Sequence, residues 1–271
     1  MRLKRRVLKL INSAIWNPLD LHLLNLSQAI QDDRDSKLSI DIDSDIYTLT
    51  DTDNPTILDV GANLGQSIDR FKQIWPSSRI ISFEPNPSSV RQLFKKYSGT
   101  SGITIVESAV ADLSSHRRLF QFEDSALDSF FDRHDDSWIT EDSTGSTEVS
   151  CVTLDDYCAR NELESIDLLK VDVQGAELDV INGATRLLDN CRIRLVQLEL
   201  IFCDLYEGGV PAGSLLNKMD SLGYELVGFY QQVVHNGRLG WADGLWQVSP
   251  GRGGGRKVDI SHNLLHRPEL S

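Results

Sequence analysis

Apolar and polar positions follow two alternating patterns between residues 56 and 248. Short apolar runs, typical of buried strands, alternate with stretches in which apolar residues recur every three or four positions, as in a helix. The expected strands cover residues 56–60, 79–83, 103–108, 166–171 and 194–200. The expected helices cover residues 67–75, 88–97, 154–161, 176–188 and 212–222. This order predicts an α/β protein with a mostly parallel sheet.

The end of the pattern differs from its beginning. The extended segments 224–230 and 241–248 follow each other without a helix, and Gly237 marks a turn between them. Strands joined by a short turn pair antiparallel, so we expect the last strand to run against the others. Two further extended pieces, 117–122 and 148–152, flank an acidic, turn-rich region at 123–148. Such a run is usually a solvated loop, and the composition of this one also fits a lid over a neutral, hydroxylated ligand.

The chain before residue 55 has a different character. Residues 1–26 carry five basic side chains and apolar residues at helical spacing. This predicts a basic amphipathic helix that packs on the domain or touches an anionic membrane or a partner. Residues 32–53 hold eight aspartates and are expected to be a solvated connector, with a short strand at 38–40. We therefore expect an N-terminal helical and acidic extension over 1–54, one large α/β domain over 55–250 and a flexible tail over 251–271.

Composition narrows the class of protein. The 271 residues carry a net charge of −13, which argues against nucleic-acid binding because affinity for phosphates comes from lysine and arginine. No stretch approaches about 18 consecutive apolar residues, so no transmembrane helix is expected. The spacing of the cysteines fits neither zinc sites nor disulfides, so they are expected to be reduced core residues of a cytosolic protein. They are Cys151, Cys158, Cys191 and Cys203.

The first strand, turn and helix carry the most informative residues. Asp59 lies near the end of the strand, and Gly61 and Gly65 form a turn before the helix. Such a turn brings backbone N–H groups and a helix N-terminus up to a ligand. Glu84 closes the second strand about 20 residues beyond the turn, where an acid can accept hydrogen bonds from a ribose.

The same residues discriminate between nucleoside-bearing ligands. A dinucleotide fingerprint requires glycine at the positions of Asn63 and Gln66, and no Gly-Lys-Ser/Thr of a P-loop follows. Acids at two strand ends and a neutral turn suit the ammonium, carboxylate, ribose and sulfonium of S-adenosylmethionine best. An ordinary βα turn without a ligand is the alternative for this piece taken alone.

Six motifs then occur in a fixed order. They are DVGANLG at 59–65, FEPNP at 83–87, SAVAD at 108–112, VTLDDY at 152–157, IDLLKVDVQGAE at 166–177 and QLEL at 197–200. Together with WADGLW at 241–246, they resemble the FkbM family of S-adenosylmethionine-dependent methyltransferases over residues 56–248. The resemblance implies a class I methyltransferase fold, which is Rossmann-like. Its seven-stranded sheet has the order 3-2-1-4-5-7-6, an antiparallel strand seven and helices on both faces.

The resemblance also implies which residues meet the cofactor. Residues 59–65 would surround its methionine end, Glu84 would hold the ribose hydroxyls, and 108–110 would border the adenine. The candidates are Asp59, Gly61, Ala62, Asn63, Gly65, Gln66, Ser67, Glu84, Pro85, Asn86, Ser108, Ala109, Val110 and Asp172. The family is associated with O-methylation of hydroxyls on sugars, glycolipids and secondary metabolites. Gln174 stands where the family commonly has glutamate.

Asp172 is the first candidate for catalysis, and by the resemblance it faces the methyl group. Transfer to an alcohol requires a hydroxyl aligned with the methyl and a group that accepts its proton. Asp172 can be that base, can bind Mg²⁺ that lowers the pKa of the hydroxyl, or can cap the next helix while touching the cofactor. His134 and His235 are rival bases. Lys170 is expected to pair with Asp172 or Glu199, or to form a structural ion pair.

The leading prediction is an S-adenosylmethionine-dependent O-methyltransferase that acts on a small-molecule or glycan hydroxyl. One alternative is a catalytically inactive cofactor-binding subunit of a larger assembly. Another is an oxidoreductase with a Rossmann domain, which Asn63 and Gln66 disfavour. The sequence identifies neither the acceptor nor the oligomeric state.

Overall fold

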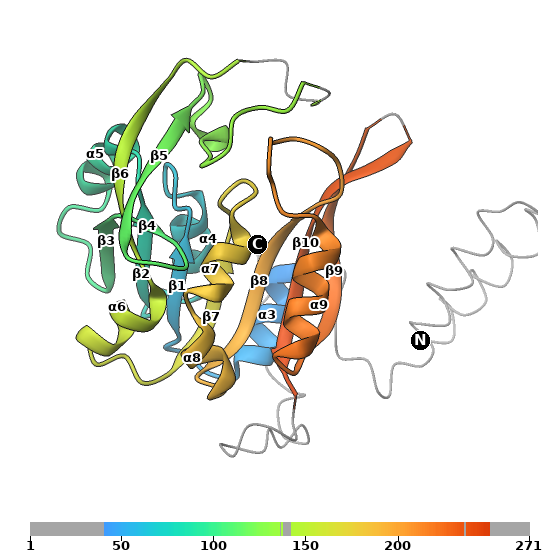
Figure 1. Ribbon diagram of the computed structural model, residues 1–271. Helices are drawn as coiled ribbons and strands as arrows, with labels where there is room; N and C mark the ends of the chain where they lie inside the picture. The colour runs from blue at the N-terminus through green and yellow to red at the C-terminus, as the bar shows by residue number, and fades with distance from the viewer. Residues whose placement is uncertain (1–40, 136, 138–141, 236, 250–271) are drawn as a thin grey trace, which may run out of the picture. The chain divides into compact units, whose positions relative to one another are not determined.

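The computed structural model describes residues 41–135, 137, 142–235 and 237–249. The chain divides into two compact units, Met1–Thr48 and Leu49–Ser271. The second unit holds the sheets and the helices α4 to α9 (Figure 1). The expected division at residues 54 and 250 stays a prediction, and the basic helix, the short strand at 38–40 and the tail lie outside the described residues.

A seven-stranded sheet forms the centre of the second unit, with the order β3-β2-β1-β7-β8-β10-β9. Its strands are β1 (Thr56–Val60), β2 (Arg79–Glu84), β3 (Ile103–Glu107), β7 (Ile166–Val171), β8 (Ile193–Ile201), β9 (Tyr224–His235) and β10 (Arg238–Val248). The first five strands pair in parallel, and β10 is antiparallel to both β8 and β9. This confirms the class I methyltransferase strand order.

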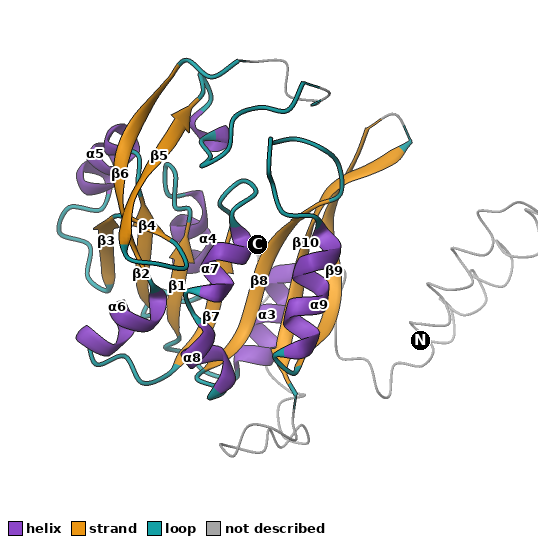
Figure 2. Cartoon of the chain, viewed as in Figure 1, coloured by secondary structure: helices purple, strands orange, loops and turns teal. Residues whose placement is uncertain are grey.

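Helices cover both faces of this sheet, as expected. They are α4 (Gln66–Ile74), α5 (Pro87–Lys96), α6 (Leu154–Arg160), α7 (Glu177–Asn182), α8 (Thr185–Asp189) and α9 (Ala212–Ser221). Figure 2 shows α6 to α9 on one face, and α4 and α5 lie on the other. Because both faces are covered, the central strands are apolar throughout rather than alternating. Leu58 and Val60 of β1 are buried in the same cluster as the apolar residues of α6 to α9.

A second sheet branches off after β3. It consists of β4 (Ala109–Val110), β5 (Ser115–Gln121) and β6 (Gly145–Val152) in the order β4-β6-β5. The sequence predicted the two extended pieces but not their antiparallel pairing. Between β5 and β6 the chain forms a short 3₁₀ turn, η1 (Ser125–Leu127), and a long connection. This connection belongs to the acidic region for which the sequence left open a solvated loop or a lid.

Two expectations about single elements were wrong. The helix expected over 176–188 is two short helices, and the first ends at Gly183. At this position the chain packs directly against Ala111, since a β-carbon on Gly183 would overlap the carbonyl oxygen of Ala111. Part of the supposed solvated connector is the helix α3 (Ile42–Thr50), in which Ile42 and Ile46 are buried. Its first turn is capped by Asp41, which accepts a hydrogen bond from the Ser44 backbone N–H at 3.2 Å.

The structure also shows the state of the cysteines and the character of the helices. All four cysteines are free thiols, and Cys151 and Cys158 are buried whereas Cys191 and Cys203 are half-buried. Within the described residues, no helix combines the length and the apolar character needed to cross a membrane.

Candidate active site

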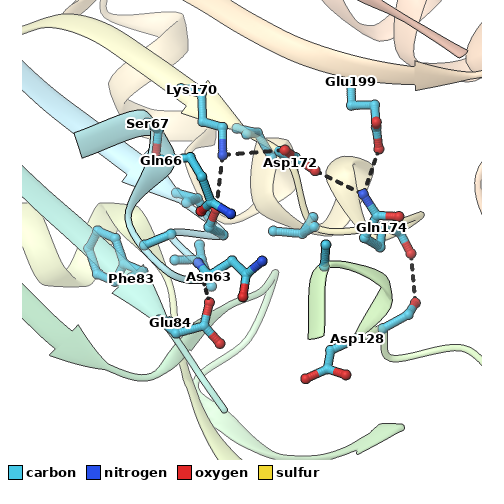
Figure 3. A pocket seen from close by; sticks show the side chains of 18 of the residues that line it. Asn63, Gln66, Ser67, Phe83, Glu84, Asp128, Lys170, Asp172, Gln174 and Glu199 are labelled. Carbon is cyan, nitrogen blue, oxygen red and sulfur yellow. Dashed lines mark hydrogen bonds and ion pairs between the residues drawn. The ribbon is translucent and has the colours of Figure 1, made fainter. Parts of the chain in front are cut away.

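A cavity of about 500 Å³ lies at the carboxyl ends of β1, β2 and β7 (Figure 3). It is bordered by the turn after β1, the end of β2, the segment 125–130 and residues of β8, β9 and β10. Open α/β sheets bind ligands at this edge, and the volume is within the usual range for small-molecule sites, about 300–1,000 Å³.

The turn after β1 is fixed by close backbone contacts. The N–H groups of Gly61 and Ala62 donate to the carbonyl oxygen of Phe83 at 3.0 and 3.2 Å. Gly61 has φ of 82°, and a β-carbon there would overlap the carbonyl oxygen of Asp172. Glycine is therefore required at this turn because the end of β7 approaches it directly.

Glu84 closes β2 and borders the cavity with a side chain that is almost fully buried. Its two oxygens accept hydrogen bonds from the backbone N–H groups of Asn63 and Asn86, both at 2.8 Å. Burial raises the pKa of Glu84 to about 7, although these two hydrogen bonds favour the ionised form and limit the increase. The carboxyl is thus held in place by main chain from two separate turns.

Lys170 connects the first turn to the end of β7. Its Nζ donates to the Gly61 carbonyl oxygen at 2.9 Å and lies 3.4 Å from Asp59 Oδ1 and 3.5 Å from Asp172 Oδ2. Burial would lower the pKa of Lys170, but the carboxylates of Asp172 and Asp59 outweigh burial and raise it. Lys170 is therefore a buried ammonium group held between two acids.

Asp59 is completely buried and does not border the cavity. Its Oδ2 accepts hydrogen bonds from the hydroxyls of Ser67 at 2.7 Å and Ser82 at 3.0 Å. Together with the ion pair to Lys170, these contacts orient two residues, Ser67 and Lys170, that do border the cavity.

Asp172 borders the cavity with a side chain that is 42% exposed. Its backbone N–H donates to the Val60 carbonyl oxygen at 3.1 Å, which continues the β1–β7 pairing into the turn. Its Oδ1 accepts from Gln174 Nε2 at 2.9 Å, and its Oδ2 faces Lys170 (Figure 3). The side chain is thereby oriented from both sides.

Further acids lie near Asp172. Burial and the charges of Asp172, Glu177 and Asp243 raise the pKa of Glu199. Burial and the charge of Asp172 raise the pKa of Asp243 to about 6, opposed by a hydrogen bond from Gln197. Burial raises the pKa of Glu177 to about 7, although backbone N–H groups hydrogen-bond it. This end of the cavity is therefore strongly acidic.

Most of the predicted cofactor residues come together around the cavity. Those that border it are Gly61, Ala62, Asn63, Gln66, Ser67, Glu84, Pro85, Ala109, Val110 and Asp172. Besides Asp59, three do not. Gly65 begins α4, and its carbonyl accepts from the Tyr97 hydroxyl. Asn86 caps α5, and the Ser108 hydroxyl donates to the Ser150 carbonyl oxygen.

The structure does not support His134 as a residue of the cavity, and it leaves His235 untested. The backbone N–H of His134 donates to the Leu205 carbonyl oxygen, and the residue does not border the cavity. His235 ends β9, and its side chain lies outside what the structure describes. Of the two catalytic candidates whose side chains the structure describes, Asp172 borders the cavity and His134 does not.

Sequence reasoning missed several residues of the site, among them Asp128, Gln197 and Asp243. The sequence held a signal for Asp243, because Trp241 and Asp243 are two positions apart in one expected strand and therefore point to the same face. In the structure both residues border the cavity. Nothing in the local pattern indicates Asp128, which reaches the site from the long connection after β5.

Comparisons with known proteins agree with this arrangement. A family model described as the methyltransferase FkbM domain matches residues 59–226. The chain belongs to the FkbM methyltransferase family. The 2-O-methyltransferase NoeI of Sinorhizobium fredii is 30% identical over 210 residues, which cover 72% of this chain and 83% of NoeI. The methyltransferase sdnD of Sordaria araneosa is 27% identical over 156 residues, which cover 48% of this chain and 60% of sdnD.

The solved structures that resemble the chain include magnesium protoporphyrin IX methyltransferase from Synechocystis PCC 6803. The likeness covers 87% of this chain and 86% of that chain, at 8% identity and a TM-score of 0.46.

The FkbM methyltransferase family member described here is an S-adenosylmethionine-dependent O-methyltransferase, as the sequence predicted. The residues of the cavity fit this cofactor. Five carboxylates border it against two cations, Arg70 and Lys170, which suits a ligand that carries a sulfonium and an ammonium group.

Proposed function

We propose that the cavity binds S-adenosylmethionine between the turn after β1 and the end of β2, and that Asp172 accepts the proton of an acceptor hydroxyl. The observation that carries the proposal is that Glu84 and Asp172, at the ends of two strands that flank β1, border one cavity. Glu84 would accept hydrogen bonds from the ribose hydroxyls. Residues of the first turn would hold the methionine end, and Ala109 and Val110 would border the adenine.

Bound S-adenosylmethionine supplies an electrophilic methyl group for an in-line displacement. The contribution of Asp172 is to orient the acceptor oxygen and take its proton. Its exposure to the cavity and its two fixed contacts, to Gln174 and Lys170, support this role. Participation of Mg²⁺ at Asp172 stays a prediction.

The acceptor is proposed to be a hydroxyl of a sugar, glycolipid or secondary metabolite. The end of the cavity away from Glu84 is bordered by Gln231, Val233, Trp241 and Asp243. An indole ring beside polar side chains suits a hydroxylated ring that presents one apolar face. The name 2-O-methyltransferase of the relative NoeI supports an oxygen acceptor. A cytosolic location and a membrane contact of the N-terminal residues stay predictions.

Two measurements test the proposal. Calorimetry should detect binding of S-adenosylmethionine and no comparable binding of NAD, which separates the methyltransferase from a Rossmann oxidoreductase. Formation of S-adenosylhomocysteine with a library of free sugars, glycolipids and polyketide alcohols should then identify an acceptor. Cofactor binding without turnover on any hydroxyl would favour the inactive partner subunit. Turnover abolished by chelation and restored by Mg²⁺ would show that the reaction requires a metal, and loss of Mg²⁺ binding in Asp172→Asn would place that metal at Asp172.

A further inference from the structure

Gln174 makes more contacts within the site than its place in a turn requires. Its backbone has φ of 56°, in the left-handed region. Its Nε2 donates to Asp172 Oδ1 and to Glu199 Oε2, both at 2.9 Å (Figure 3). Its Oε1 accepts from the Tyr206 hydroxyl at 2.8 Å. A carboxamide offers two N–H donors and one carbonyl acceptor. Every polar group of this side chain is therefore used.

Gln174 also connects the acids to two segments from distant parts of the chain. They are the connection between β5 and β6 and the segment around Tyr206 after β8, and we call them the covering segments. Its backbone carbonyl accepts from the Ser129 hydroxyl at 2.6 Å, in the connection between β5 and β6. Tyr206 follows β8, and its hydroxyl lies 3.3 Å from the Leu127 carbonyl oxygen of the same connection. The position of the acids is thus coupled to the position of both segments.

We propose that Gln174 is a positioning residue of the methyl transfer, whose amide nitrogen holds Asp172 and Glu199 in one arrangement beside the covering segments. The inference rests on the proposed role of Asp172 as the proton acceptor. A carboxylate of the same length would offer no N–H donor and would place a third negative charge between two acids.

The charges around position 174 make the difference between an amide and a carboxylate there large. Among the described residues, two cations act on this cluster, Lys170 and Arg70, and the other titratable groups are acids or a phenol: Asp128, Asp172, Glu177, Glu199, Tyr206 and Asp243. Burial and the neighbouring carboxylates already raise the pKa of Glu199. An amide donor between Asp172 and Glu199 stabilises both carboxylates without adding charge.

The test compares Gln174→Glu and Gln174→Met in the full chain, with Gln73→Glu on the exposed side of α4 as the matched charge control. At saturating S-adenosylmethionine, both Gln174 variants should lose about 10–100-fold in kcat, the scale of a misplaced catalytic group, while cofactor affinity changes by less than about threefold. Gln73→Glu should match the wild type in both measurements.

A second readout does not depend on turnover. In Gln174→Glu the added carboxyl has a raised pKa in the folded protein, so its cost is small at low pH, where it is neutral, and grows as pH rises. The difference in melting temperature from the wild type should therefore widen between about pH 5 and about pH 8. It should widen less for Gln174→Met and stay constant for Gln73→Glu.

The two readouts separate the inference from the proposed function. A Gln174→Glu variant with normal kcat, or with a melting difference that is the same at every pH, would overturn the bridging role. Absence of turnover in the wild type would instead contradict the proposed function. A melting difference that widens with pH in Gln174→Met as well, which adds no charge, would then still support the bridge, because the amide donor that stabilises both carboxylates has been removed.

Discussion

The two ends of the cavity are built in different ways. At the cofactor end, Glu84 and the turn after β1 are held by backbone N–H groups and by a glycine that admits a neighbouring strand. At the other end, Asp172 and Glu199 are held by side chains, chiefly the amide of Gln174. Main-chain contacts tolerate changes of side chain, whereas a side-chain network depends on each member. The proposed proton acceptor Asp172 lies at the second end, whereas Glu84 and the turn that would bind the cofactor lie at the first. We therefore expect substitutions at the second end to change turnover and those at the first end to change cofactor affinity.

The largest effect on turnover is expected for Asp172→Asn. Loss of a positioned proton acceptor should lower kcat by about 10²–10⁴. Affinity for S-adenosylmethionine should change little, because the hydrogen bonds that hold Glu84 remain. The measurements are single-turnover rates and calorimetry on the same preparation. Near-normal turnover would show that this carboxylate is structural and would return attention to His134 and His235.

Gly61→Ala tests whether the cofactor end of the cavity depends on the close main-chain contact between the turn after β1 and the end of β7. The added β-carbon would overlap the Asp172 carbonyl oxygen, so β7 and the turn must move apart. We expect a loss of about 2–4 kcal/mol in the free energy of unfolding together with loss of cofactor binding. Gly99→Ala is the matched control: its φ of 77° is also positive, but no atom lies within 4 Å of the added carbon.

A cost of only about 1 kcal/mol is expected for Gly99→Ala from backbone strain. If urea unfolding gave the same loss in the free energy of unfolding for both variants, the close approach of Asp172 to Gly61 would contribute nothing to the cost of Gly61→Ala. Equal cofactor affinity for Gly61→Ala and the wild type would remove the turn from the binding site.

The same difference explains how much of the molecule the sequence could predict. The strands and the site residues Gly61 and Glu84 follow from periodicity and spacing, because main-chain geometry at strand ends repeats between proteins. The sheet order was predicted from the resemblance to the FkbM family. Asp59 was placed in the right strand, but its burial beneath Ser67 and Lys170 depends on packing that spacing does not encode.

The other end was less predictable for a physical reason. Glu199 and Asp243 lie opposite each other there on β8 and β10, which are far apart in the chain, and no local pattern records that these two side chains face one cavity. The split of the helix at Gly183 and the pairing of β5 with β6 depend in the same way on contacts between distant segments. Asp172 was found because it lies at a strand end, whereas its contacts with Gln174 and Lys170 required the structure.

The smallest effect concerns pH and isolates the first end. Burial raises the pKa of Glu84 to about 7, so the free protein loses this carboxylate charge as pH falls through that value. Ribose hydroxyls donate hydrogen bonds, and the ionised carboxylate is the better acceptor. Affinity for S-adenosylmethionine should therefore fall by about tenfold between about pH 8 and about pH 6, because the ionised fraction changes by that factor. Glu84→Gln should bind more weakly at the higher pH and show a flat profile, since its amide does not titrate there. Calorimetry at several pH values checks both curves. A profile in Glu84→Gln as steep as in the wild type would assign the titration to the acids around Asp172, and the two ends of the cavity would then not be separable by charge.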